Sequence, residues 1–262
     1  MNTSINNTQQ LKSILTNDIQ ASLGIAHNAS LYIQQKEALS VKGFAKIQTV
    51  IASISSAMRT LIILNDMSLR CEDTNYLKMS YCNIDNFFNS LVNELNFLFA
   101  AGTDVSFKYS SKFEKTRTFY ININEIEKIL YSLIYCLVKN LDKHDKKEIK
   151  ISIDETTGKK SSYIITITSK GKPLGKKLIS IFDKANSKFI DFYNLDVLSL
   201  LNVRKNIEAF GASITYTSTK TMNKFIFCLP HTTELEQLEY NECVPYTPDT
   251  DFIRAYFYEL LV

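Results

Sequence analysis

The side chains best suited to acid–base or nucleophilic chemistry are few and scattered in this 262-residue chain. Its three histidines, His27, His144 and His231, are far apart in sequence, and none has the spacing of a metal-ligand set. The cysteines are also scattered, without a Cys-x-x-Cys pair: Cys71, Cys82, Cys136, Cys228 and Cys243. The chain has no Gly-x-Ser-x-Gly motif and no Walker loop. We therefore expect no metal centre, and we interpret the cysteines as reduced thiols of a cytoplasmic protein.

Composition and charge favour an ordinary globular protein, with 45% hydrophobic and 22% charged residues. The 30 basic and 27 acidic side chains leave a net charge of +3, which does not favour nucleic acid or an anionic membrane as the main partner. The longest apolar runs, such as Leu61–Leu64 and Leu133–Val138, are far shorter than the roughly 20 residues that span a bilayer. The polar N-terminus lacks the basic region of a signal peptide. We expect a cytoplasmic protein with no nucleic-acid or membrane partner.

Two helical patterns come before residue 70. The first runs from about Thr8 to Lys36, with small or apolar side chains at Leu11, Leu15, Ile19, Ser22, Ala26, Ala29 and Ile33. After a turn expected at Gly43, the second has Ile47, Val50, Ile51, Ile54, Ala57, Met58, Leu61 and Leu64. Two long helices joined by a short turn predict an antiparallel hairpin. Because each apolar stripe is too wide for one partner, we expect two chains to form a four-helix bundle.

After Arg70 the sequence mixes strand-like and helix-like segments. Strands are expected at Tyr76–Cys82, Val105–Tyr109, Thr118–Ile121, Ile149–Ile153, Tyr163–Thr168, Ile214–Tyr216 and Phe225–Leu229, and helices at Ile84–Phe99, Glu125–Val138 and Leu195–Phe210. Since a strict β-α-β alternation is missing, an α+β sandwich is favoured over a doubly wound sheet. A terminal helix is expected after Pro248, with an apolar face made of Phe252, Ile253, Tyr256, Phe257, Leu260 and Leu261. So apolar a helix should be docked, and we expect it to pack on the sandwich. The alternative is a detachable helix that binds a groove of a partner.

The stretch from Ile14 to Ala26, I-L-T-N-D-I-Q-A-S-L-G-I-A, resembles the phospho-acceptor segment of bacterial sensor histidine kinases, roughly F-L-S-H-E-L-R-T-P-L-N-x-I. Asn17 stands where that family has its reactive histidine, and Asp18 stands at the neighbouring acidic position. An amide nitrogen lacks a basic lone pair and cannot attack a phosphoryl group as an imidazole does. The resemblance therefore implies a kinase scaffold without the kinase nucleophile.

Residues Asn75 to Pro230 resemble the ATP-binding domain shared by histidine kinases, gyrase, heat-shock chaperone 90 and mismatch-repair ATPases. The first nucleotide box of that family corresponds to residues 122–137, N-I-N-E-I-E-K-I-L-Y-S-L-I-Y-C-L. Ser132 replaces its first asparagine, and Cys136 replaces the asparagine that coordinates magnesium. A neutral thiol is a poor ligand for a cation that prefers oxygen. A buried core cysteine is the favoured interpretation of Cys136.

The other two boxes also depart from the family pattern. In the second, D-x-G-x-G, Ser169 replaces the aspartate that accepts a hydrogen bond from adenine, and Gly171 retains the first glycine. A hydroxyl can still accept that bond but carries no charge. In the third, G-x-G-L-G-L, the glycines that admit phosphate fall on Leu195, Val197 and Ser199. We therefore expect no bound nucleotide, no cofactor and no metal.

Together these features predict three segments. Residues 1–72 form a dimerising helical hairpin, residues 73–230 an ATPase-like α/β sandwich, and residues 231–262 a C-terminal extension whose helix lies near or across the vestigial nucleotide pocket. The resemblance implies a catalytically inactive relative of histidine kinases, acting as a regulatory or scaffold partner in two-component signal transduction. The expected partners are a second copy of the chain and a response regulator or sensor kinase.

Two alternatives remain open. His27 lies ten residues beyond Asn17, a rotation of roughly 80° around a helix, and could be the displaced acceptor of a phosphorelay phosphotransferase with a vestigial ATPase domain. The other interpretation of His27 is an unremarkable, partly exposed side chain. The second alternative is an active histidine kinase with atypical boxes, which the residues at Cys136, Leu195, Val197 and Ser199 disfavour.

Overall fold

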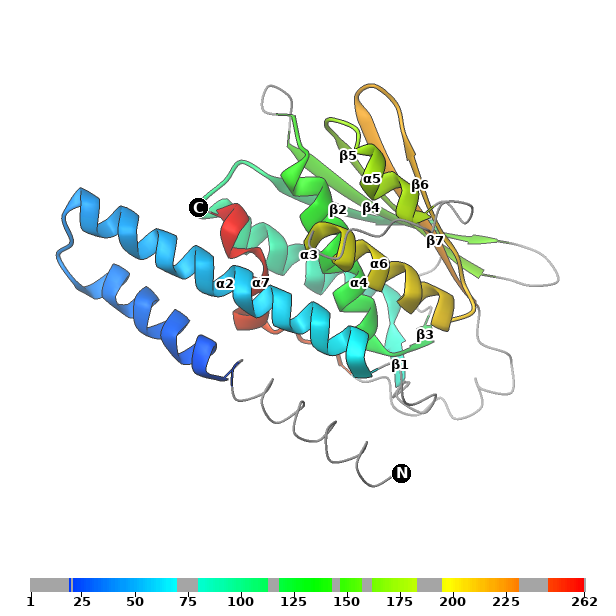
Figure 1. Cartoon of the computed structure of the whole chain (residues 1–262). Helices are drawn as coiled ribbons and strands as arrows, with labels where there is room; N and C mark the ends of the chain where they lie inside the picture. Colours follow the sequence, from blue (N-terminus) through cyan, green and yellow to red (C-terminus); the bar gives the residue numbers. More distant parts are fainter. Residues whose placement is uncertain are drawn as a thin grey trace, which may run out of the picture. The chain divides into compact units, whose positions relative to one another are not determined.

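The structure is a computed structural model of the whole chain (Figure 1). It describes residues 19, 21–69, 80–112, 118–142, 147–156, 162–182, 195–230 and 245–261. By its internal contacts the chain divides into two compact units. The hairpin unit comprises Met1–Thr74 and Arg254–Val262, and the sandwich unit comprises Asn75–Ile253. The C-terminal extension is therefore shared between the two units.

The hairpin unit contains a first helix, residues 21–36, and the long helix α2, Val41–Leu69, which run antiparallel (Figure 1). The short segment 37–40 joins them, and Ser40 Oγ accepts a hydrogen bond from the backbone N–H of Gly43 at 3.1 Å. Ser40 thus acts as the N-terminal cap of α2. The sequence predicts the turn at Gly43, but the structure has it a few residues earlier, at 37–40. The reason is that Ser40 caps α2, so the helix begins before the glycine.

Residues Val41–Leu64 of α2 are long and apolar enough to cross a membrane, by length and composition only, with a mean hydropathy of 1.6. The expectation from uninterrupted apolar runs missed this segment, because its few charged side chains interrupt the runs without lowering the mean. Only 22% of that window is buried. The exposed positions of the segment include the large apolar side chains of Val41, Phe44, Val50 and Leu64.

The sandwich unit contains, in chain order, β1 (Ser80–Asn83), α3 (Ile84–Ala100), β2 (Ser106–Ser111), β3 (Thr118–Ile121), α4 (Ile123–Lys139), β4 (Glu148–Thr156), β5 (Ser162–Lys170), α5 (Lys176–Ile179), a 3-10 turn (Ser180–Phe182), α6 (Leu195–Ala209), β6 (Ile214–Ser218) and β7 (Met222–Pro230). Five strands form a sheet in the order β2-β4-β5-β7-β6, in which only β2 and β4 are parallel. The antiparallel pair β1–β3 stands apart. This confirms the α+β sandwich, with shifted element ends.

Alternation along the strands builds the core of the sandwich. Ile149, Ile167 and Phe225, from the three central strands, are fully buried on the face that the helices cover. Successive side chains of a strand point to opposite faces, so every second residue faces this core. Helices α3, α4 and α6 lie on one side of the sheet (Figure 1). Helix α4 is capped by Asn122, whose side chain accepts a hydrogen bond from the N–H of Glu125 at 3.0 Å.

The last helix, α7 (Thr250–Leu261), begins where the sequence predicts, because Asp249 Oδ1 accepts a hydrogen bond from the N–H of Phe252 at 3.0 Å. In the sandwich unit, the Phe252 ring lies 5.9 Å from that of Tyr131, and the Tyr246 ring lies 4.5 Å from that of Phe87. From Arg254 onward the helix belongs to the hairpin unit. Docking on the sandwich is therefore confirmed only for the first part of the extension.

Candidate functional site

The site implied by the sequence centres on one face of α4. Glu125, Ser132, Cys136 and Lys139 are separated by seven, four and three residues, a spacing that places them on one stripe of an α-helix. Glu125, Ser132 and Cys136 are buried, and only 4% of the Cys136 surface is exposed. The stripe thus brings together both residues that stand in place of the family's asparagines.

Helix α6 covers this stripe. At the start of α4, Asn206 Nδ2 donates a hydrogen bond to Glu125 Oε2 at 3.1 Å, and at its end Lys139 Nζ forms an ion pair with Asp196 Oδ2 at 2.6 Å. Because Asn206 is near the end of α6 and Asp196 near its start, the two helices run antiparallel. The two replaced asparagine positions lie between these contacts. Polar contacts at both ends therefore hold α6 across the face of α4 where the resemblance places magnesium.

The positions of the third box are packed into the sandwich. Val197 and Ser199 are buried on α6, and Leu195 is half-buried at its start. Farther along α6, Asn202 and Asn206 are buried too, and their Oδ1 atoms have no hydrogen-bond partner among the described residues. An anion-binding loop needs backbone N–H groups that a phosphate can approach. Here the three positions belong to a helix and carry side chains.

Ser169 and Gly171 lie where the second box would receive adenine. Ser169 is buried at the end of β5, and its hydroxyl has no hydrogen-bond partner among the described residues. A Cβ at Gly171 would overlap the carbonyl oxygen of Asn140, at the end of α4. The N–H of Gly171 donates to the carbonyl oxygen of Thr221 at 3.0 Å. The retained glycine is thus required by close backbone packing, independently of any nucleotide.

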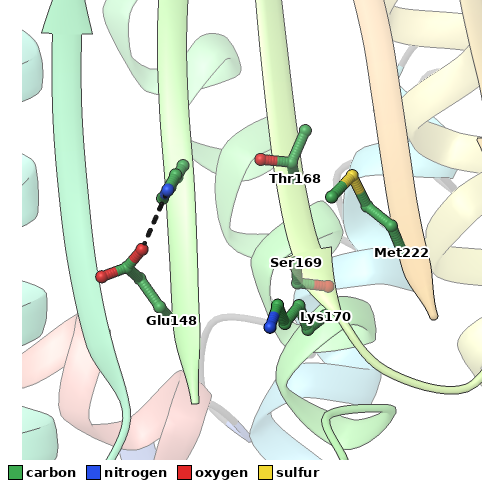
Figure 2. A pocket seen from close by; sticks show the side chains of 6 residues that line it. Glu148, Thr168, Ser169, Lys170 and Met222 are labelled. Atoms are coloured by element: carbon green, nitrogen blue, oxygen red, sulfur yellow. Dashed lines mark ion pairs between the residues drawn. The ribbon is translucent and has the colours of Figure 1, made fainter. Parts of the chain in front are cut away.

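A cavity of about 280 Å³ lies at the same end of the sheet (Figure 2). It is lined by Glu148, Lys150, Thr168, Ser169, Lys170 and Met222. In Figure 2, Glu148 on β4, Thr168 on β5 and Met222 on β7 lie around the cavity. Glu148 forms an ion pair with Lys150 at 3.2 Å. Since Ile149 and Ile167 face the core, their neighbours Glu148 and Thr168 face the other side of the sheet. Only Ser169 of the box positions lines the cavity, so it is not the pocket that the resemblance implies.

The acceptor positions Asn17 and Asp18 lie outside the described residues. His27 is described, and only 4% of its surface is exposed. Its ring meets the ring of Tyr258 edge to face, with centroids 5.5 Å apart and planes at 85°. The interpretation of His27 as a partly exposed side chain is wrong for this conformation, whereas its role as an alternative acceptor stays a prediction. The helical pattern around His27 gave no sign of Tyr258, which comes from the other end of the chain.

Sequence reasoning missed a half-buried carboxylate on the opposite face of α4. Glu127 accepts hydrogen bonds from Tyr131 Oη at 2.8 Å and from Tyr246 Oη at 2.5 Å. Burial raises the pKa of Glu127, although both tyrosine hydroxyls act to lower it. Glu127 and Cys136 are nine residues apart, about half a turn around the helix axis. The part of the extension that belongs to the sandwich unit therefore docks away from the box positions, and for this part the expected place near or across the vestigial pocket is wrong. The i,i+4 spacing of Glu127 and Tyr131 was the only available signal.

No protein-family profile and no curated protein sequence matches the chain. Solved structures do resemble it. Full-length ShkA in complex with AMPPNP matches with a TM-score of 0.61 at 11% identity, over 90% of this chain and 47% of ShkA. The histidine kinase AdeS of Acinetobacter baumannii matches with a TM-score of 0.51 at 14% identity, over 80% of this chain and 95% of that chain. This chain thus spans less than half the length of ShkA.

Identities this low carry no residue roles, so the likeness concerns the fold. The similarity to ShkA extends over nine-tenths of this chain, which is more than the sandwich unit alone. This chain therefore has a histidine-kinase-like core, in which a helical hairpin is combined with an ATPase-like α/β sandwich.

Proposed function

We propose that this chain is a catalytically inactive histidine-kinase-like protein that acts as a regulatory or scaffold partner in two-component signal transduction. The fold supports two-component signalling at a coarse level. The observation that carries the proposal is the closure of α6 over the Ser132 and Cys136 positions of α4, through the contacts of Glu125 and Lys139. The proposed partner is a response regulator or an active sensor kinase, since helical hairpins of this type are the surfaces on which regulators dock.

The residues at the box positions fit ATP and magnesium poorly. Cys136 offers a buried thiol where a hard cation needs oxygen. Glu125 is the one carboxylate of the α4 stripe, and it already accepts a hydrogen bond from Asn206 and pairs with Lys128 at 3.1 Å. Ser169 supplies no charge for the adenine amino group. No catalytic step through a nucleotide follows from such a site.

Calorimetric titration of the full chain with ATP and magnesium tests this proposal. We expect no binding heat up to about 1 mM nucleotide, a concentration at which even a weak site of about −4 kcal/mol is half filled. The Cys136→Asn variant restores one oxygen ligand while α6 still covers it, so it should stay silent as well. A dissociation constant in the micromolar range for the wild-type chain would overturn the proposal and favour the atypical active kinase.

Self-association through the hairpin is the second part of the proposal. Large apolar side chains are exposed along both of its helices: Ile19, Ile25, Tyr32, Ile33, Val41, Phe44, Val50 and Leu64. Contiguous apolar exposure of this kind marks an interaction surface. A second copy is the cover we propose, because the neighbouring fold family builds a four-helix bundle from two such hairpins.

A cytoplasmic location fits this assignment better than a membrane span. Arg59 lies within the apolar window of α2, is buried, and its guanidinium is 3.9 Å from the Glu259 carboxylate. A guanidinium within a bilayer-spanning helix costs several kcal/mol on insertion scales, about +2.5 to +3.5. The apolar side of α2 is therefore assigned to a protein partner.

A phosphorelay phosphotransferase that uses His27 is the second candidate. Its buried ring opposes direct transfer in this conformation, because an imidazole must reach the phosphorus atom to attack it. Incubation with a phosphorylated response regulator separates the candidates. Label that appears on the chain and disappears in His27→Gln would favour the phosphotransferase over the scaffold.

A further inference from the structure

The hairpin unit buries polar side chains beside apolar ones such as Ile51, Ile63 and Phe257. Among its described residues, four polar side chains are buried, His27, Ser30, Ser55 and Arg59, and we call these four the polar stripe. A helix of a globular protein normally turns its apolar side inward. Burying polar groups costs free energy unless they are well paired. The Ser55 hydroxyl has no hydrogen-bond partner among the described residues, so its burial costs stability in the closed hairpin unit.

Two adjacent residues of α7 contact the polar stripe from within the same unit. The Tyr258 ring meets the His27 ring at 5.5 Å, and Glu259 Oε2 lies 3.9 Å from Arg59 Nη2. Because His27 is on the first helix and Arg59 on α2, α7 contacts both helices of the hairpin. Tyr258 is itself buried and hydrogen-bonds the Gln34 side chain. This end of α7 thus covers the polar stripe as a third helix.

The segment Arg254–Leu261 buries Tyr256 and Phe257, but its ion pair to the polar stripe is weak. The ion pair of Glu259 is long and partly exposed to solvent, where screening reduces its contribution. Helix α7 has 12 residues, which is marginal for an isolated helix in water. Its helical form therefore depends on docking. A helix held in this way opens locally more easily than the sandwich core.

We propose that the second half of α7, Arg254–Leu261, is an autoinhibitory cover that keeps His27 and Arg59 away from solvent and from a docking response regulator. A response regulator that contacts the polar stripe has to displace the cover first. The apparent affinity of the regulator for this chain therefore depends on the fraction of molecules in which α7 is released. The role in signalling rests on the proposed function, whereas the cover itself is measured without any partner.

Modification of His27 by diethyl pyrocarbonate, followed by peptide mass spectrometry on the full chain, tests the cover. In the wild-type chain we expect His27 to react on the order of tenfold more slowly than N-acetylhistidine, because reaction requires local opening. Tyr258→Ala should raise the rate several-fold, and Glu259→Gln should raise it less. Asp251→Asn is the matched control, since Asp251 is an exposed residue of the same helix outside the hairpin unit, and its rate should equal that of the wild type.

Circular dichroism guards against a folding defect. Glu259→Gln preserves side-chain size, so it keeps the test valid even where Tyr258→Ala does not fold. Reaction of wild-type His27 at the rate of N-acetylhistidine would overturn the cover, and so would unchanged rates in both α7 variants. Nucleotide binding in the calorimetric titration would sink the proposed function while leaving the cover intact.

Discussion

The sandwich unit and the hairpin unit treat their apolar side chains in opposite ways. In the sandwich the large apolar side chains are buried, and among its described residues only Phe97 and Met222 are large hydrophobics exposed to solvent. In the hairpin, both helices expose large apolar side chains while the polar stripe is buried. The sandwich therefore buries its large apolar side chains more completely than the hairpin does. The difference supports the proposal that the hairpin is the part of the molecule that meets partners.

The largest effect is expected from charges on the exposed side of α2. Val50→Glu combined with Leu64→Glu places two carboxylates 14 residues apart, on nearly the same side of the helix. Each apolar side chain buried in a dimer contributes about 1.5–3 kcal/mol, and buried charges oppose assembly further. Light scattering should show twice the chain mass for the wild type and a single chain mass for the variant.

Lys42→Glu is the control for this change. Lys42 is an exposed polar residue in the first turn of α2, where a negative charge also suits the helix dipole. Its mass should match that of the wild type. A double variant that keeps the wild-type mass would move the interface away from the hairpin and remove the contrast between the units.

A core substitution in the sandwich should have the next largest effect. Phe225 is fully buried in the centre of the sheet, so Phe225→Ala should lower the free energy of unfolding by about 3–5 kcal/mol in urea denaturation. Phe44 is exposed on α2, and Phe44→Ala should cost less than about 0.5 kcal/mol in protein diluted to the monomer. Similar losses of unfolding free energy in Phe225→Ala and Phe44→Ala would contradict the difference in burial between the two units.

The retained glycine offers a sharper test inside the sandwich. Gly171→Ala forces a Cβ onto the Asn140 carbonyl oxygen, and we expect a loss of about 1–3 kcal/mol from overpacking. A Cβ at Gly175 would instead extend into open space, and the φ of −59° at this residue is ordinary for any amino acid. Gly175 is also the N-cap of α5, where glycine is preferred over alanine, so the backbone-entropy gain is offset and Gly175→Ala should change stability by less than about 1 kcal/mol. Thermal melts without nucleotide measure both. Equal melting temperatures would mean that packing does not require glycine at 171.

Local patterns in the sequence were enough to predict most of the sandwich. The i,i+3 and i,i+4 spacing located α3 and α4, and two-residue alternation located β4 and β5, because each pattern is a property of one segment. The Asp249 cap of α7 was equally local. The positions that the family resemblance assigns to the nucleotide boxes could be compared residue by residue, and their degeneracy stays a prediction.

Contacts between distant segments could not be predicted in this way. The hydrogen bond from Asn206 to Glu125 joins residues 81 positions apart, and that from Tyr246 to Glu127 joins residues 119 apart. The closure of α6 over α4 and the docking of the extension both depend on such pairs. The burial of His27 depends likewise on Tyr258. Hydrophobic periodicity indicates that one face of a helix or strand is buried, but it does not identify the segment that packs against this face.

The smallest effect is expected at Glu127, where burial raises the carboxyl pKa above its ordinary value of 4.5. Below that ordinary value the carboxyl is protonated in both folded and unfolded chains, and it imposes no ionisation penalty on folding. As the pH rises above 4.5, the unfolded chain loses the proton first, so the folded state becomes less favoured until the pKa of Glu127 in the folded chain is passed.

Glu127→Gln stays neutral at every pH. The stability of this variant relative to wild type should therefore increase from about pH 4.5 toward neutrality. The expected increase is on the order of 1 kcal/mol or less, the scale of one net hydrogen bond. Urea denaturation across that pH range measures the difference, with Asn124→Gln, an exposed and uncharged position of α4, as the control that should follow the wild type. Parallel stability curves for Glu127→Gln and wild type would show that the half-buried carboxyl does not titrate differently on folding.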